Sequence, residues 1–365
     1  MAPTLLVGSC EPFSGKSAVV LGLARQLRAR GIEVRFGKPL ATSLETDAPP
    51  PPGEPLVDAD VRFVGTTLGL AEDQLIPSLD ALDPALARAR LLEGRLEPGP
   101  GFAALRQQLE QAPDGMALLE AAGSLHEGLL YGLSLPQLAR GLDAPVLLVQ
   151  PWADSRSVDS LLAARAELGD HLVGVVLNAV NPDAVPQLRE DTVPALEQLG
   201  ISVLGVMPRS PLLRSVTVEE LARRLGAQVL CCRDRLDLLV ETLSIGAMNV
   251  NSAMEFFRRR RNMAVVTGAD RTDIQLAALE ASTQCLILTG AGDPLPQLLT
   301  RAEELEVPLL KVEHDTLTTV EVIEQAFGHV RLHEAVKATY AFRLVEEHCD
   351  FGRLFTRLQL PAMSL

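Results

Sequence analysis

Residues 4–28, TLLVGSCEPFSGKSAVVLGLARQLR, decide the fold of this chain. The apolar run Thr4–Val7 predicts a strand, and the amphipathic run Ala18–Arg28 predicts a helix. Between them lie the short loop Gly8–Ser14 and the sequence Gly15-Lys16-Ser17. A helix start of this kind offers a phosphate backbone N–H groups, the positive end of the helix dipole and one mobile ammonium. The stretch therefore predicts a phosphate or nucleotide site.

In that site we expect Ser14 and Gly15 to bind phosphate through their backbone, Lys16 to supply the ammonium and Ser17 to ligate Mg²⁺. The loop departs from the Walker A pattern, because Cys10 stands where that motif has its first glycine. A structural turn without a ligand is the alternative. The position of Gly-Lys-Ser between a strand and a helix favours phosphate binding.

Composition narrows the class of protein. A chain of 365 residues fits two domains with a small tail, and a hydrophobic fraction of 47% suffices for full cores. The net charge of −14 argues against nucleic-acid and membrane-surface partners. The five cysteines show no Cys-x-x-Cys spacing, and no signal-like start or membrane-span pattern is found. We therefore expect a cytoplasmic protein with reduced thiols.

Strand and helix patterns alternate regularly through the first half of the chain. This alternation predicts an α/β fold with a parallel sheet and helices on both faces. After Leu225 a second alternation predicts a smaller α/β domain, so the expected boundaries are 1–225, 226–330 and a helical tail at 331–365. We expect the tail to pack on the second domain or on a partner subunit. The proline-rich stretch Ala48–Pro55 predicts an exposed loop.

Ligands of such sheets bind beyond the carboxyl ends of the strands, so polar residues there are candidates. Lys38 follows the strand Glu33–Phe36 and is either a second ammonium for the phosphates or a solvated loop lysine. Asp58 and Asp60 open a helical pattern, where they are helix-capping residues or ligands of the metal on Ser17.

Three further strand ends carry candidates. Glu120 ends the strand Met116–Leu119 and is predicted to contact Mg²⁺. Asn178 is placed to read the edge of an adenine, and Pro208 and Arg209 to line the same pocket. Capping or turn formation is the alternative for Asn178, Pro208 and Arg209.

Together these motifs resemble the dethiobiotin synthetase family of P-loop ATPases over about residues 1–225. The residues that carry the resemblance are Gly15-Lys16-Ser17, Lys38 before a proline, Asp60, Glu120 in LLEAAG, Asn178 and Pro208. The resemblance implies that Lys16 and Ser17 hold ATP and Mg²⁺ and that Lys38 contacts the transferred phosphate. It also implies that Asp60 and Glu120 complete the metal site and that Asn178 binds adenine. Lys16 and Lys38 are thus the expected catalytic residues.

The second half resembles the DRTGG domain. The motif stretches are Gly246-Ala247-Met248, Gly268–Ile274, Leu288–Gly290 and His314–Thr319, although the core reads Asp-Arg-Thr-Asp-Ile. We expect Asp270 and Thr272 to cap a helix and Arg271 to pair with a phosphate or with Asp315. The resemblance implies a homodimer or higher homo-oligomer, and an adenine-nucleotide effector at this domain.

The pair of domains is similar to the N-terminal part of long bacterial phosphate acetyltransferases. The chain ends where their acetyltransferase domain would begin, which implies that it lacks that activity. Our first hypothesis is a regulatory or scaffold protein that binds ATP or ADP with Mg²⁺, self-associates through its second domain and has a protein partner still to be identified. The alternatives are an ATP-dependent ligase of the dethiobiotin synthetase or cobyrinic acid diamide synthase type, and a degenerate domain kept for assembly without nucleotide.

Overall fold

The computed structural model describes residues 3–44, 54–111, 115–246 and 249–360, which form two compact units. Unit 1 comprises residues 1–209 together with 331–365, and unit 2 is the intervening stretch Ser210–Val330. Within the described ranges no helix is both long and apolar enough to cross a membrane. Most of the predicted loop Ala48–Pro55 lies outside the described residues.

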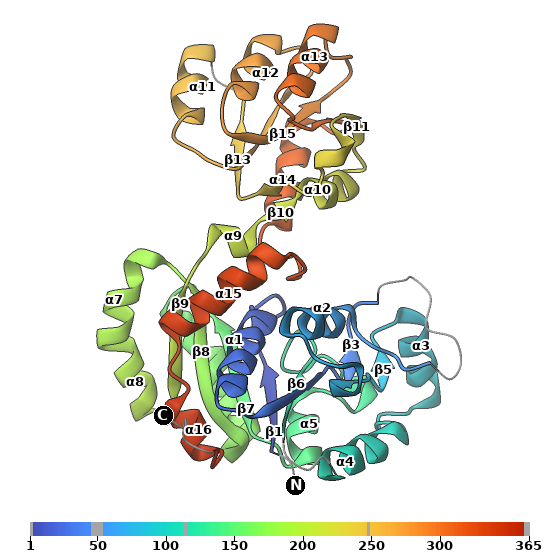
Figure 1. The fold of residues 1–365 in the computed structure, drawn as a ribbon, viewed down its shortest axis with the longest axis vertical. Coiled ribbons are helices and arrows are strands. Elements are labelled where there is room, and N and C mark those ends of the chain that lie inside the picture. Colours follow the sequence, from blue (N-terminus) through green and yellow to red (C-terminus); the bar gives the residue numbers. More distant parts are fainter. Residues whose placement is uncertain (1–2, 45–53, 112–114, 247–248, 361–365) are drawn as a thin grey trace. The chain divides into compact units, whose positions relative to one another are not determined.

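Unit 1 is built on a seven-stranded parallel sheet with strand order β4-β2-β6-β1-β7-β8-β9 (Figure 1). Its strands are β1 Thr4–Gly8, β2 Glu33–Gly37, β4 Leu75–Ile76, β6 Gly115–Glu120, β7 Val146–Pro151, β8 Leu172–Val180 and β9 Val203–Pro208. Two short strands, β3 Leu40–Ala41 and β5 Asp80–Ala81, pair separately. Because β1 lies between β6 and β7, the loop after it opens at the middle of the sheet edge.

Helices cover both faces of this sheet, as predicted (Figure 1). One face packs on α4, α5 and α6 through side chains such as Leu6 and Leu119. Helix α1 packs with α2 and α15. The helices of unit 1 are α1 Lys16–Ala29, α2 Ala59–Leu68, α3 Pro84–Glu93, α4 Gly101–Gln111, α5 Leu135–Leu142, α6 Val158–Leu168, α7 Val185–Gln187, α8 Val193–Gln198, α15 Ala335–His348 and α16 Gly352–Arg357.

The helical stretch 185–198 is interrupted. A π-helical turn at Leu188–Thr192 separates α7 from α8. Pro194 stands at the start of α8, where it lacks the N–H needed to continue the α-helical ladder and its ring crowds the preceding turn. The proline explains why the pattern is helical but the helix is not continuous.

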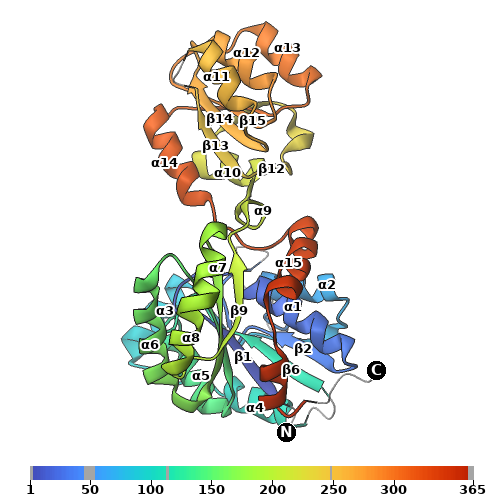
Figure 2. The same ribbon diagram turned by 90° about the vertical axis from the view of Figure 1, so that its left-hand side faces the viewer.

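The C-terminal segment packs on unit 1, which corrects the first of our two alternatives, that it packs on the second domain. Helix α15 lies against α1 and β9 (Figure 2), and α16 contacts β8. Gly205 of β9 forms a β-bridge with Cys349, directly after α15. The buried face of α15, which includes Ala338, Ala341 and Val345, has its apolar partners in unit 1.

Unit 2 contains a five-stranded sheet with order β11-β16-β15-β14-β13, in which only the β11–β16 pair is antiparallel. Its strands are β11 Gln228–Cys231, β13 Thr242–Ile245, β14 Met263–Gly268, β15 Thr283–Thr289 and β16 Leu309–Val312, with β10 Val216–Thr217 and β12 Leu239–Val240 paired beside them. Its helices are α9 Pro211–Arg214, α10 Val218–Leu225, α11 Val250–Phe257, α12 Thr272–Leu279, α13 Pro296–Glu304 and α14 Thr316–Ala326.

The compact second unit begins at Ser210 rather than at the expected residue 226. Helix α10 accounts for the difference, because its side chains Val218, Leu221 and Leu225 belong to the core that α14 also covers. The strand and helix alternation alone could not show which core these apolar residues join.

Candidate functional site

The loop after β1 leads directly into the start of α1, where Gly15 precedes the first helical residue. Gly15 has φ 90°, and a Cβ added there would stand 2.3 Å from Nδ2 of Asn178. The same Nδ2 donates to the backbone carbonyl of Ser14 at 2.7 Å. Glycine is therefore required at this position both for its left-handed backbone and for the close approach of Asn178.

The N-terminus of α1 keeps its anion-binding capacity. This 14-residue helix begins at Lys16, and within the described chain no side chain caps it. The hydroxyl of Ser14 is buried and has no hydrogen-bond partner among the described residues. Unsatisfied donors at the positive end of a helix dipole suit a phosphate.

Lys16 is buried, and its Nζ donates to the carbonyl of Gly123 at 3.0 Å. Burial lowers its pKa, and the nearby Glu120 carboxylate opposes this effect. Gly123 lies three residues after Glu120, so Lys16 reaches the turn that follows β6.

Glu120, the last residue of β6, links two parts of the site. Ser17 Oγ donates to its Oε1 at 3.4 Å, and Lys38 Nζ lies 3.8 Å from the same oxygen. Its other oxygen, Oε2, is buried without a hydrogen-bond partner in the described part of the protein. Burial raises the pKa of Glu120 despite the charges of Lys38 and Lys16.

Lys38 is a buried member of the cluster, not a solvated loop lysine. Its Nζ donates to Oδ2 of Asp60 at 2.5 Å and to Oγ1 of Thr42 at 2.8 Å, and it lies 3.6 Å from Oδ1 of Asp58. Burial would lower its pKa, but the carboxylates of Glu120, Asp60 and Asp58 outweigh burial and raise it. Lys38 is therefore held as a charged ammonium.

The sequence left helix capping and metal binding open for Asp58 and Asp60, and the structure gives the two aspartates different surroundings. Asp58 is the N-cap of α2, where its Oδ1 accepts the N–H of Asp60 at 2.8 Å. Its Oδ2 accepts the N–H groups of Thr42 and Ser43 at 2.7 and 3.0 Å, which fixes the chain after Lys38. Asp58 thus has a structural role.

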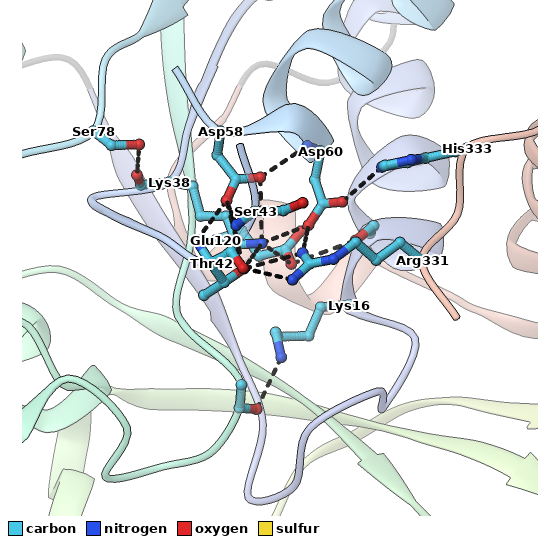
Figure 3. A network of polar contacts seen from close by, with 12 residues as sticks. Lys16, Lys38, Thr42, Ser43, Asp58, Asp60, Ser78, Glu120, Arg331 and His333 are labelled. Atoms are coloured by element: carbon cyan, nitrogen blue, oxygen red, sulfur yellow. Dashed lines mark hydrogen bonds and ion pairs between the residues drawn. The ribbon is translucent and has the colours of Figure 1, made fainter. Parts of the chain in front are cut away.

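Asp60 faces two cationic side chains and a histidine (Figure 3). Its Oδ2 accepts from Lys38 and, at 2.8 Å, from Nη1 of Arg331, while His333 Nε2 lies 3.0 Å from its Oδ1. Burial would raise the pKa of Asp60, but the His333 contact and the charges of Lys38 and Arg331 hold it well below its usual range.

The Ser17–Glu120 pair fits Mg²⁺ chemically, whereas Asp60 does not. Magnesium takes one or two carboxylates together with hydroxyl, water and phosphate oxygens. Ser17 and Glu120 are in contact, and Glu120 has an unpartnered oxygen, so this pair fits. Both oxygens of Asp60 face cationic or histidine partners, so Asp60 does not fit in this arrangement. Among the described residues no group of three or more His, Cys, Asp or Glu side chains is suited to a metal.

The structure brings together most of the predicted residues. Ser14, Gly15 and Asn178 meet at the loop, and Ser17, Lys38, Glu120 and Asp60 form a continuous chain of contacts. Pro208 and Arg209 lie at the carboxyl end of β9, where the N–H of Arg209 donates to Val180. In the described chain no hydrogen bond or ion pair joins these two residues to the cluster.

Sequence reasoning missed four residues of the cluster: Thr42, Ser43, Arg331 and His333. Thr42 and Ser43 lie a few positions after Lys38, so the segment was indicated but its polar contacts were not. Arg331 and His333 lie 271 and 273 positions from Asp60, and no local pattern marks them.

In unit 2 the described DRTGG-like residues lie at the ends of β13, β14, β15 and β16 or in the segments that follow them. Thr267 Oγ1 donates to the carbonyl of Gly246, and the hydroxyls of Thr289 and Thr316 lie 2.8 Å apart. Asp315 caps α14. The prediction that Asp270 or Thr272 caps a helix is wrong, because α12 starts at Thr272 with Arg271 as its N-cap and without a side-chain cap.

In the same unit Arg271 Nε lies 3.4 Å from Oδ1 of Asp273. Of the predicted motif Gly246-Ala247-Met248, the last two residues lie outside the described residues.

Comparison with protein families gives two matches. A family model described as AAA domain matches residues 3–217, and a model described as DRTGG domain matches residues 220–326. The first covers more than half of the chain. The order of the two matches is the one that the sequence motifs predict.

Curated relatives fall into two kinds. A phosphate acetyltransferase of Nitratidesulfovibrio vulgaris is 27% identical over 383 residues, which cover 98% of this chain and 52% of the relative. The ATP-dependent dethiobiotin synthetase BioD of Pseudomonas aeruginosa (strain LESB58) is 34% identical over 212 residues, which cover 57% of this chain and 90% of the relative. This chain thus spans about half the length of the phosphate acetyltransferases it matches.

Among solved structures, one match is the CBS and DRTGG regulatory region of Clostridium perfringens pyrophosphatase complexed with its activator, diadenosine tetraphosphate. The TM-score is 0.29 at 16% identity, over 43% of this chain and 74% of that chain.

Proposed function

The chain belongs to the dethiobiotin synthetase-like AAA-domain family of P-loop proteins, and from this membership we propose that unit 1 binds ATP or ADP together with Mg²⁺. The observation that carries the proposal is the contact of Ser17, at the start of α1, with the partly unpartnered carboxylate of Glu120. A hydroxyl and a carboxylate beside an uncapped helix start and a buried lysine match what a metal-bound polyphosphate requires.

In this proposal each residue has a separate task. The amides at Ser14 and Gly15, with Lys16, bind the phosphates, and Ser17 and Glu120 hold the metal. The metal would screen the phosphate charges and fix their orientation. Asn178 holds the loop through Ser14 and has a second amide hydrogen and an oxygen for the adenine edge, while Pro208 and Arg209 line the base side of the site.

We propose a regulatory or scaffold role for the protein as a whole. Its support is the DRTGG match over residues 220–326. In this role unit 2 mediates self-association and binds an adenine-nucleotide effector. Light scattering on the full chain, with and without ATP, ADP and AMP, tests both points. A monomer whose mass and melting temperature do not respond to nucleotide would overturn the role of unit 2.

One observation favours a second candidate, an ATP-dependent ligase. Lys38 is a buried, charged ammonium within reach of Glu120, and such a group stabilises charge on a transferred phosphoryl group. In this reaction an oxygen of a substrate carboxylate or carbamate attacks the γ-phosphorus, the bond to the β-phosphate oxygen breaks, and ADP leaves.

Two measurements decide between these functions. Calorimetry with ATP, in the presence and absence of Mg²⁺, is expected to show metal-dependent binding to the wild-type chain. Absence of any binding would overturn the nucleotide proposal. ADP release that depends on an added carboxylic acid would identify the ligase, whereas binding without turnover supports the regulatory role.

A further inference from the structure

The carboxylate of Asp60 accepts hydrogen bonds from two cationic side chains. Its Oδ2 accepts hydrogen bonds from Lys38 at 2.5 Å and from Arg331 at 2.8 Å. Thr42 Oγ1 also accepts from both, at 2.8 and 3.1 Å. Two positive side chains that share two acceptors lie close together, and arginine and lysine are the usual side-chain donors to phosphate.

Asp60 holds this pair in a fixed orientation. Its second oxygen contacts His333, whose ring also lies 5.5 Å from the ring of Phe63. The guanidinium of Arg331 is fixed further by the hydrogen bond from Nη2 to the carbonyl of Thr42 at 2.7 Å. The two cations are therefore positioned before any ligand arrives.

The Nε–H group of Arg331 can still donate a hydrogen bond to a ligand. Its side chain is 32% exposed, in contrast to 4% for Lys38. In the described part of the chain its Nε has no acceptor, so one edge of the guanidinium fork is free for a planar or tetrahedral anion.

Anchoring the C-terminal segment does not require this arginine. Helix α15 begins four residues later and packs on α1, and Gly205 pairs with Cys349 beyond its end. A partly exposed ion pair adds little to such an interface. The position of Arg331 beside Lys38 thus calls for another role.

The order of contacts indicates which part of a nucleotide Arg331 meets. From the start of α1 the contacts run from Ser17 to Glu120, then to Lys38, Asp60 and Arg331. The helix start binds the inner phosphates in a P-loop. Arg331 is at the far end of this series, beyond Lys38.

We propose that Arg331 is a third cationic side chain of the phosphate site, that it binds the terminal phosphate of a nucleoside triphosphate, and that Asp60 is its positioning residue. The inference rests on the proposed nucleotide binding of unit 1. It assigns to the C-terminal segment a part of the site that residues 1–209 do not supply.

The test is calorimetry on the full chain with ATP, ADP and AMP, each with Mg²⁺. Arg331→Gln, which keeps a polar stem, is expected to weaken ATP binding by about tenfold or more, because it removes a charge-assisted contact. ADP affinity falls less and AMP affinity does not change. Arg331→Lys restores part of the ATP affinity, and Asp60→Asn gives the same order of losses as Arg331→Gln.

Arg343→Ala is the matched control, because Arg343 is an exposed arginine of α15 that pairs with Glu347. This variant is expected to bind all three nucleotides as the wild type does. If Arg331→Gln does not fold, the comparison of Arg331→Lys with the wild type over the same nucleotides decides.

Two results would overturn the inference alone: Arg331 variants that bind ATP as the wild type does, and variants that bind Mg-ATP more tightly. The second would show that Arg331 competes with the metal for Asp60. A wild-type chain that binds no nucleotide would instead overturn the proposed function, so the two failures are distinguishable.

Discussion

Gly22 of α1 lies directly against Val345 of α15: a Cβ added at Gly22 would stand 2.4 Å from Cβ of Val345. The two helices therefore approach so closely that only a glycine fits between them. Since α15 follows Arg331 and His333, this contact also fixes the segment that reaches Asp60. The α1–α15 contact therefore helps to hold Arg331 and His333 beside Asp60.

Replacement of Gly22 by alanine is expected to destabilise the protein. In an exposed helix this change would add about 1 kcal/mol of stability through helix propensity. Here the new methyl group collides with a stiff β-branched side chain, and overpacking of this kind costs about 1–3 kcal/mol. Urea denaturation of Gly22→Ala and of the wild type measures the difference in the free energy of unfolding.

Gly65→Ala is the control for this prediction. Gly65 also lies inside a helix, α2, but the atom nearest to its added Cβ would be Cδ2 at the flexible end of Leu75. We expect this variant to lose less stability than Gly22→Ala. Equal losses in the two variants would contradict the close α1–α15 contact.

Asp60→Asn is expected to lower the free energy of unfolding by about 3 kcal/mol at neutral pH, because it leaves the buried ammonium of Lys38 without its nearest counter-charge. The pKa of Asp60 is depressed in the folded state, so its stabilisation is present above the unfolded pKa of about 3.9 and is lost as pH falls below it. The difference in the free energy of unfolding between wild type and variant is therefore present at neutral pH and narrows below about pH 4.

Asp293→Asn provides the comparison, because its ion pair with Lys311 is on the surface, where the Asp293 side chain is 92% exposed. Urea titrations over this pH range should show little change for that variant. A gap for Asp60→Asn that widens as the pH falls would contradict the assigned ionisation of Asp60.

The parts of the site that the sequence predicts are those coded locally. The loop of residues 8–17 lies between a strand and a helix, so its ligand chemistry follows from the order of elements alone. Lys38 and Glu120 could be placed because each follows a strand, and parallel strands end at one edge of the sheet. The register confirms this reasoning, since Val7 of β1 pairs with Glu120.

The parts that it does not predict depend on long-range packing. Arg331 lies in a segment without periodicity, and its approach to Asp60 depends on which unit α15 packs against. An amphipathic helix shows that it has a partner but not which one. The apolar residues of α10 raise the same difficulty, because their pattern fits either core until the tertiary contacts are known.

Glu120→Gln is expected to raise the free energy of unfolding of the ligand-free protein at pH 8. Burial raises the pKa of Glu120 in the folded state above its unfolded value of about 4.3, so the protonated form is favoured and stability falls as the pH rises through the folded pKa. A neutral glutamine avoids that cost. Urea denaturation at pH 5 and pH 8 should show an advantage for the variant that grows with pH.

The same substitution should weaken ATP binding only when Mg²⁺ is present, because a neutral amide is a poor magnesium ligand. Glu33→Gln, at the exposed start of β2, is the control for both measurements. If Glu120→Gln is less stable than the wild type at pH 8, the prediction is wrong. The attraction of the ionised Glu120 to Lys16 and Lys38 would then stabilise the folded protein by more than the burial of its charge costs.

Lys16→Ala separates binding from folding. The ammonium of Lys16 is buried and donates to the Gly123 carbonyl, and burial lowers its pKa, so its removal relieves a desolvation cost. Alanine also suits the first position of a helix. We therefore expect a melting temperature equal to or above that of the wild type and an ATP affinity lower by about 100-fold, since charged contacts to the phosphates are lost. Calorimetry should show lost ATP binding, and light scattering should show the same molecular mass as for the wild type. Lys311→Ala, which removes a partly exposed lysine of unit 2, should change neither measurement. ATP binding by Lys16→Ala at wild-type strength would refute the phosphate site.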